Sequence, residues 1–162
     1  MTVINVARNT DTLTMTIAAQ FIAPVERVWQ LWADPRQLER WWGPPMFPAT
    51  FVEFDLTPGA TASYYMTGPN GEQPHGWWRV ISVDQPHTIE FEDGFSDDTG
   101  IPNPDMPTTF TQVTLRADEA GTRMEIATRF SSRAAMDQMI EMGMEEGMTL
   151  AVGQMDAIIA TA

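Results

Sequence analysis

The chain has 162 residues, 43% hydrophobic and 19% charged, which is typical of one globular domain. With 22 Asp and Glu against 9 Lys and Arg, its net charge of −13 repels phosphate backbones and argues against nucleic-acid binding. The absence of cysteine excludes disulfides, thiolate metal sites and cysteine nucleophiles. Neither a signal-peptide pattern nor a run of about 18 apolar residues is present, so we expect a cytoplasmic protein without a membrane span.

The first quarter of the chain predicts a strand followed by two short helices. Residues 13–22 begin with alternating apolar and polar side chains, as in a strand with one buried face. The sequence PVERVWQLWAD then places apolar side chains at helical spacing and ends at Asp34-Pro35. A second helix is expected in PRQLERWW, and Gly43-Pro44-Pro45 ends it.

Six further strands are expected, separated by turns rich in Gly and Pro. They cover residues 50–56, 60–67, 76–83, 87–92, 109–117 and 122–130. The connection 93–107 contains Asp93, Asp97, Asp98 and Asp105. We interpret it as a solvated loop, because it lacks the ligand spacing of a calcium site. A lid over a pocket is the alternative, since the loop is longer than usual.

From Ser132 onward, apolar residues recur at steps of three and four as far as Ile159, which predicts one helix of about 28 residues. Gly143, Gly147 and Gly153 weaken this helix and permit a bend or the close approach of a partner. The order of the predicted strands and helices indicates an α+β fold in which a curved antiparallel sheet of six to seven strands surrounds a long C-terminal helix. We expect one domain over residues 1–162, with its core in 13–160.

A strongly curved sheet cannot follow a straight helix along its whole length, so we expect an apolar cavity between the two. The 12 Met and 6 Trp suit an adaptable pocket and equally suit an ordinary core. Neighbouring residues of a strand face opposite sides, so only one of Trp77 and Trp78 can face inward. We expect His75 or Arg79 to anchor a ligand, although pairing of Arg79 with a carboxylate is the favoured alternative. The expected apolar wall consists of Trp42, Tyr64, Trp77, Met139, Met144 and Met148.

Three segments of the sequence resemble a known family. They are FIAPVERVWQLWADPRQLERWWGP (21–44), LTPGATASYYMTGPNGE (56–72) and MGMEEGMTLAVGQMDAIIA (142–160). Together they resemble the proteins related to the activator of Hsp90 ATPase, within the START-like, Bet v 1-like superfamily of helix-grip proteins. The resemblance extends over about residues 13–160. It implies the helix-grip fold and a single-domain bacterial protein.

We expect the chain to bind a small apolar or amphipathic ligand. The alternative is a protein-interaction module resembling an Hsp90 co-chaperone, which would need an exposed apolar or acidic patch. An enzyme acting on a hydrophobic substrate is least favoured, since it would need titratable groups converging in the cavity. We therefore expect no catalytic residue and no cofactor, and with His75 and His87 the only histidines, no metal. The sequence is compatible with a homodimer.

Overall fold

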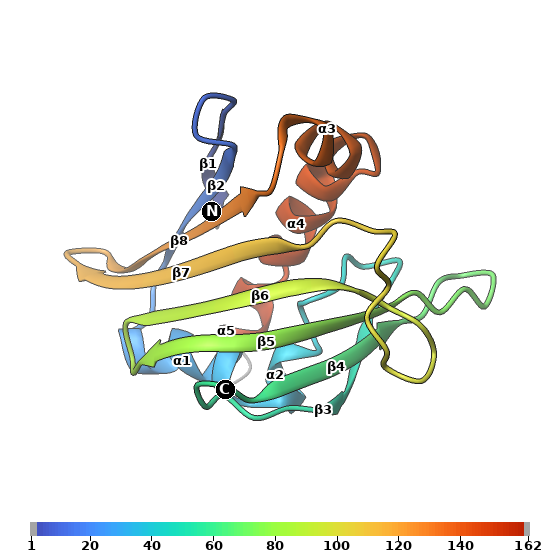
Figure 1. Ribbon diagram of the computed structural model, residues 1–162. Helices are drawn as coiled ribbons and strands as arrows, with labels where there is room; N and C mark the ends of the chain where they lie inside the picture. Colours follow the sequence, from blue (N-terminus) through green and yellow to red (C-terminus); the bar gives the residue numbers. More distant parts are fainter. Residues whose placement is uncertain (1–2, 161–162) are drawn as a thin grey trace.

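A computed structural model describes residues 3–160 and shows one strongly curved antiparallel sheet (Figure 1). The strand order is β1-β2-β8-β7-β6-β5-β4-β3, so consecutive strands from β3 to β8 are neighbours, and β2 joins β8. The described part of the chain forms eight strands: β1 Val3–Asn9, β2 Thr14–Phe21, β3 Ala49–Glu53, β4 Thr61–Met66, β5 His75–Asp84, β6 Thr88–Ser96, β7 Thr109–Asp118 and β8 Gly121–Phe130.

The predicted fold class is confirmed, with one strand more than expected. The additional strand, β1, pairs antiparallel with β2 at one edge of the sheet. Asn5, Ala7, Arg8 and Asn9 are exposed. An edge strand with this much exposure carries little of the alternating apolar pattern that predicts a strand, which explains why the sequence did not reveal it.

The two N-terminal helices, α1 Val25–Ala33 and α2 Pro35–Leu38, follow β2. The predicted stripe of α1 is confirmed: Val25, Val28, Trp29 and Trp32 are buried. The helix α2 is shorter than PRQLERWW, because Glu39 ends it and the two tryptophans lie in the following turn. Both tryptophans are nonetheless buried in the core.

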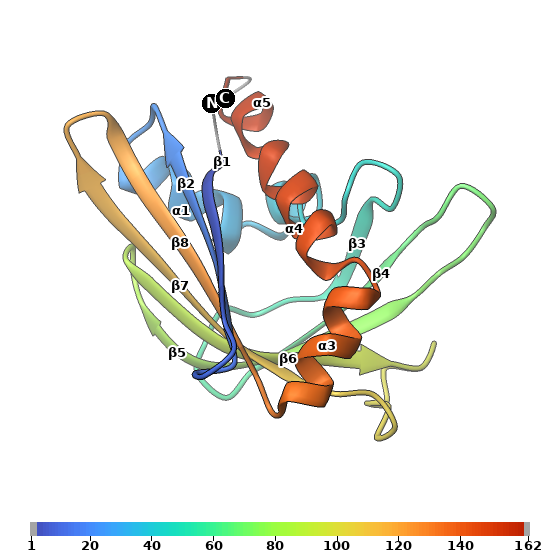
Figure 2. The ribbon, with the colours of Figure 1, turned by 90° about the horizontal axis from the view of Figure 1, so that it is seen from above.

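The C-terminal segment forms three successive helices instead of the single helix expected: α3 Arg133–Glu141, α4 Met144–Gly153 and α5 Met155–Ala160 (Figure 2). The first break occurs because Gly143 has φ 91°, a left-handed conformation that terminates α3. At the second break, the Gln154 amide donates hydrogen bonds to the backbone oxygens of Trp41 (3.4 Å) and Gly43 (2.7 Å). None of the helices in residues 3–160 is long and apolar enough to cross a membrane.

Two apolar clusters fill the space between helices and sheet. In the larger cluster, Trp78 stacks on Phe91 with ring centroids 4.0 Å apart, and Trp32 meets Trp41 edge-on at 4.7 Å. The Trp41 indole donates a hydrogen bond of 2.9 Å to the Leu31 carbonyl oxygen. The smaller cluster lies under α3 and contains Met15, Ile17, Phe130, Met136 and Met139.

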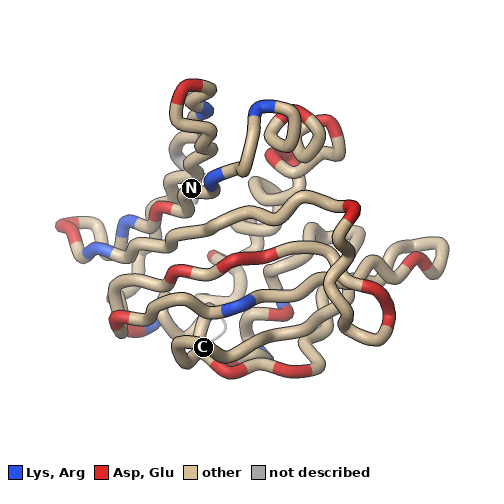
Figure 3. The backbone as a smooth tube through the Cα atoms, in the orientation of Figure 1, with Lys and Arg blue, Asp and Glu red and all other residues tan. Residues whose placement is uncertain are grey.

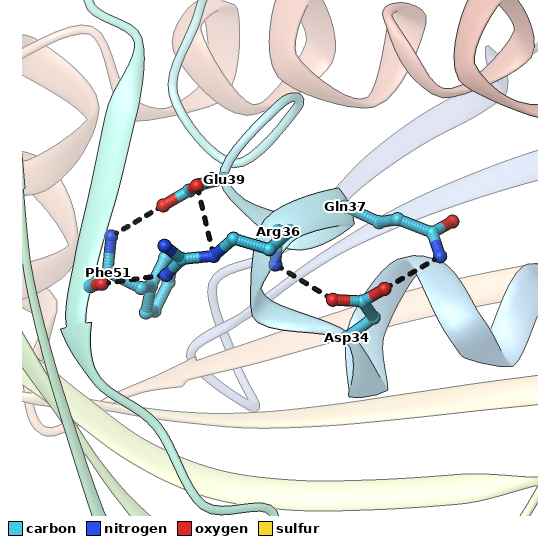
Figure 4. Close-up of polar contacts among 5 residues, drawn as sticks. All are labelled: Asp34, Arg36, Gln37, Glu39 and Phe51. Atoms are coloured by element: carbon cyan, nitrogen blue, oxygen red, sulfur yellow. Dashed lines mark hydrogen bonds and ion pairs between the residues drawn. The ribbon is translucent and has the colours of Figure 1, made fainter.

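A set of polar contacts attaches α2 to strand β3 (Figure 4). The Arg36 guanidinium donates to the Phe51 carbonyl oxygen at 3.0 Å, and the Glu39 carboxylate accepts from the Phe51 N–H at 3.0 Å. Arg36 and Glu39 also form an ion pair at 3.3 Å. Asp34 caps α2, and hydrogen bonds from the Gln37 side chain and the Arg36 N–H hold the pKa of Asp34 below its usual value.

Candidate functional site

A partly open cavity of about 260 Å³ lies between the C-terminal helices and the sheet. It is bordered by side chains packed against both apolar clusters. The helical side contributes Met139, Met142, Gly143, Met144, Gly147 and Met148. The opposite side contributes Trp42, Pro44, Tyr64, Met66, Asp93, Gly94, Phe95, Pro107 and Thr109.

Two glycines create much of the space on the helical side. An added Cβ atom at Gly143 or Gly147 would meet no atom within 4 Å, so each glycine faces open space. The break at Gly143 also places the end of α3 and the start of α4 on the cavity wall. Since Met is unbranched and flexible, the surrounding Met side chains can adapt to ligands of different shape.

The wall opposite the helices is aromatic. The rings of Trp42 and Tyr64 meet edge-on with their centroids 6.1 Å apart. Tyr64 is packed so closely on Gly76 that a Cβ atom there would lie 2.4 Å from the tyrosine hydroxyl. The absence of a side chain at Gly76 therefore determines where the Tyr64 ring lies.

One end of the cavity is polar. Asp93 on β6 faces Thr109 on β7, and the Thr109 hydroxyl donates a hydrogen bond to the Asp93 carboxylate. Burial raises the pKa of Asp93 to about 6; the Thr109 hydrogen bond opposes this shift, and the negative charge of Glu92 adds to it. Burial and the charge of Asp93 raise the pKa of Tyr64 above its usual value. At neutral pH, Asp93 is therefore mostly ionised and Tyr64 is neutral.

The sequence profile described as "Activator of Hsp90 ATPase homolog 1-like protein" matches residues 22–160. The chain belongs to this family. A crystal structure from Mycobacterium smegmatis is 46% identical, with a TM-score of 0.90 and coverage of 96% of each chain. A solution structure from Arthrobacter aurescens is also 46% identical, with a TM-score of 0.95, and covers 99% of this chain and 94% of its own.

More distant structures share the fold of the family. A crystal structure from Rhodobacter sphaeroides has 23% identity and a TM-score of 0.83, and covers 98% of this chain and 99% of its own. No curated protein matches the sequence. The family relationship therefore supports the helix-grip architecture and leaves the ligand to be inferred from the cavity.

In this family member, five of the eight expected ligand-contacting residues lie on the cavity wall: Trp42, Tyr64, Met139, Met144 and Met148. The other three, His75, Trp77 and Arg79, do not line the cavity. Arg79 forms the alternative ion pair with Glu92, at 2.8 Å. The Trp77 indole donates to the Phe95 carbonyl oxygen at 3.1 Å, and His75 Nδ1 lies 2.7 Å from the Gln73 carbonyl oxygen.

These three residues share one face of β5, and the alternate residues Gly76, Trp78 and Val80 are buried. The inward member of the tryptophan pair is therefore Trp78, whereas the expected wall contained Trp77. Because side chains alternate along a strand, the wrong choice at one position moves every second residue to the wrong face. The same shift explains why His75 and Arg79 lie away from the cavity.

The most informative residue that sequence reasoning missed is Asp93, expected in a solvated loop. Strand β6 continues to Ser96, so Asp93 lies within the sheet. Ile89 and Phe91, at steps of two before it, are buried. Continuing that alternation would have placed Asp93 on the inner face. Among residues 3–160, no three His, Asp or Glu side chains converge as a metal site would require.

Proposed function

We propose that the protein binds a small apolar or amphipathic molecule in the cavity between α3, α4 and the sheet. The observation that carries the proposal is the composition of the wall. Flexible Met side chains face the rings of Trp42 and Tyr64, and one carboxylate lies at the polar end. A mostly apolar lining with few polar groups is the usual character of a small-molecule site.

The cavity volume limits the size of the enclosed part of the ligand. An apolar cavity of about 150 Å³ accommodates benzene, which has six non-hydrogen atoms. By the same ratio, about 260 Å³ accommodates roughly ten such atoms. A phenyl ring with a short alkyl chain and one polar group has this size. Because the cavity is partly open, a longer ligand can extend into solvent.

The alternative, a protein-interaction module, has less support in this chain. The large exposed apolar residues come from several different elements and loops, as Ile22, Val52, Ile101 and Leu150 illustrate. For the enzyme hypothesis, Asp93 and Tyr64 are two titratable groups on the cavity wall. The binding experiment should therefore also monitor whether the ligand is chemically converted.

Methionine methyl NMR tests the proposal directly. In protein labelled at the Met methyl groups, titration with phenylpropanol is expected to shift the signals of Met66, Met139, Met144 and Met148. The signals of Met124 and Met155, which are buried and do not line the cavity, serve as internal controls. Mass spectrometry of denatured protein would reveal a co-purified ligand. The absence of both a saturable shift and an extracted molecule would contradict the proposal. Chemical conversion of the ligand would show that the protein is an enzyme rather than a binding protein.

A further inference from the structure

Among the described residues that line the cavity, Asp93 alone carries a formal charge at neutral pH. The lining contributed by α3 and α4 consists of Met and Gly alone, and the remaining wall is aromatic, aliphatic or hydroxyl-bearing. Asp93 is half-buried, and a carboxylate in largely apolar surroundings is costly unless a positive charge accompanies it. Asp93 therefore requires a positively charged partner.

The protein itself supplies no counter-charge to Asp93 among residues 3–160. None of the five ion pairs there includes it. Its hydrogen-bond donors are the Thr109 hydroxyl and its own backbone N–H, both of them neutral. The adjacent Glu92, by contrast, pairs with Arg79. The Arg79 guanidinium thus pairs with Glu92, and Asp93 has no ion-pair partner in the described part of the chain.

We infer that the ligand is an organic cation, a protonated amine on an apolar body, whose ammonium group binds beside Asp93 and the rings of Tyr64 and Trp42. This inference rests on the proposed function and specifies its ligand class. The ammonium provides the missing counter-charge, and aromatic rings attract cations through their quadrupole. The apolar body then occupies the space between the Met side chains.

The overall charge of the protein favours the same class of ligand. Acidic residues are distributed over many loops and strands, whereas basic residues are sparse (Figure 3). A net charge of −13 raises the local concentration of cations and repels anions. A carboxylate ligand would additionally meet Asp93 at the polar end, where two like charges repel each other in a poorly solvated space.

The inference makes binding dependent on pH. The titratable groups near Asp93 are Glu92 on β6, whose charge raises the pKa of Asp93, and Tyr64 on β4, which is neutral across this range. The cavity-lining residues of α3 and α4 have no titratable group. Since the pKa of Asp93 is about 6, its ionised fraction, and with it the affinity for an amine, should rise about tenfold from pH 5 to pH 7.5. A neutral ligand should show no such rise.

Three probes with one apolar body and different head groups test the inference: phenylpropylamine, phenylpropanol and phenylpropanoate. Affinities are measured by calorimetry and by the Met methyl shifts, for the native protein at both pH values and for two variants. Asp93→Asn removes the charge in the cavity. Glu92→Gln removes the neighbouring charge and keeps the same net charge as the first variant, so it is the matched control.

We expect the amine to bind the native protein at least tenfold more tightly than the alcohol at pH 7.5, and the propanoate to bind least. Asp93→Asn should abolish this preference while keeping alcohol binding, which also shows that the variant is folded. Glu92→Gln should keep the preference. Equal or tighter binding of the alcohol would overturn the inference and leave the proposed function standing. Failure of all three probes to bind would overturn both.

Discussion

Replacing Gly147 by Leu is expected to fill about 40% of the cavity without destabilising the fold. The added side chain has four carbon atoms, which occupy roughly 100 Å³ at the ratio of about 25 Å³ per non-hydrogen atom that benzene sets. The cavity measures about 260 Å³, and a Cβ atom at Gly147 meets no atom within 4 Å. A ligand that loses the contacts of about four carbons loses about 3 kcal/mol, or up to about 150-fold in affinity.

The matched control is Gly153→Leu, in the same helix and also without an atom within 4 Å of an added Cβ, but exposed and outside the cavity. Gly147→Leu should gain about 0.8 kcal/mol of helix propensity, and Gly153→Leu, at the last residue of α4, should gain less, as measured by chemical denaturation. Calorimetric titration with phenylpropanol should then show weakened binding for Gly147→Leu alone. Equal affinities in the two variants would mean that the ligand binds elsewhere and would refute the assignment of the cavity.

Three other substitutions examine the same site. Because burial raises the pKa of Asp93 to about 6 in the folded state, above the ordinary aspartate value of about 3.9, its contribution to stability is present below pH 4 and lost as the pH rises through 6. Asp93→Asn should therefore raise the free energy of unfolding at pH 8, relative to its effect at pH 3, by up to about 3 kcal/mol. Trp77→Ala should cost about 1–2 kcal/mol in denaturation and leave phenylpropanol affinity unchanged. Gly76→Ala, whose Cβ would lie 2.4 Å from Tyr64, should cost about 1–3 kcal/mol by overpacking and weaken phenylpropanol binding.

Each of these expectations has a contrary outcome. A pH-independent effect of Asp93→Asn would show that the carboxyl group is not buried as described. Weakened ligand binding by Trp77→Ala would place the ligand on the other face of β5. Unchanged binding by Gly76→Ala would show that the position of Tyr64 does not matter to the ligand.

The fold was predictable from sequence because most strands and the N-terminal helices bury one regular face. The details of the cavity depend on features that this pattern does not determine. Trp77 and Trp78 are chemically identical, so only the register of β5 decides which one faces inward. Apolar spacing continues from α3 into α4, and it does not reveal that Gly143 adopts a left-handed conformation.

Asp93 was difficult to predict for a different reason. A carboxylate among Gly and Pro residues is usually solvated, and the alternation of Ile89 and Phe91 was the only contrary signal. The positions of the Met side chains of the C-terminal helices were easier to predict, since one apolar stripe of these helices had to face the sheet. The apolar helical wall was therefore largely foreseen, and the polar end was not.

The contacts of Arg36 and Glu39 with Phe51 bear on how the protein could associate with itself. Strand β3 is an edge strand of the sheet. An edge strand normally presents unpaired backbone N–H and C=O groups with which a strand of another chain can pair. At Phe51 both groups are already bonded to charged side chains, which takes about 1.5–3 kcal/mol per bond to undo. Growth of the sheet from one molecule into the next is thus blocked at this position, and a self-association that avoids this cost must use another surface.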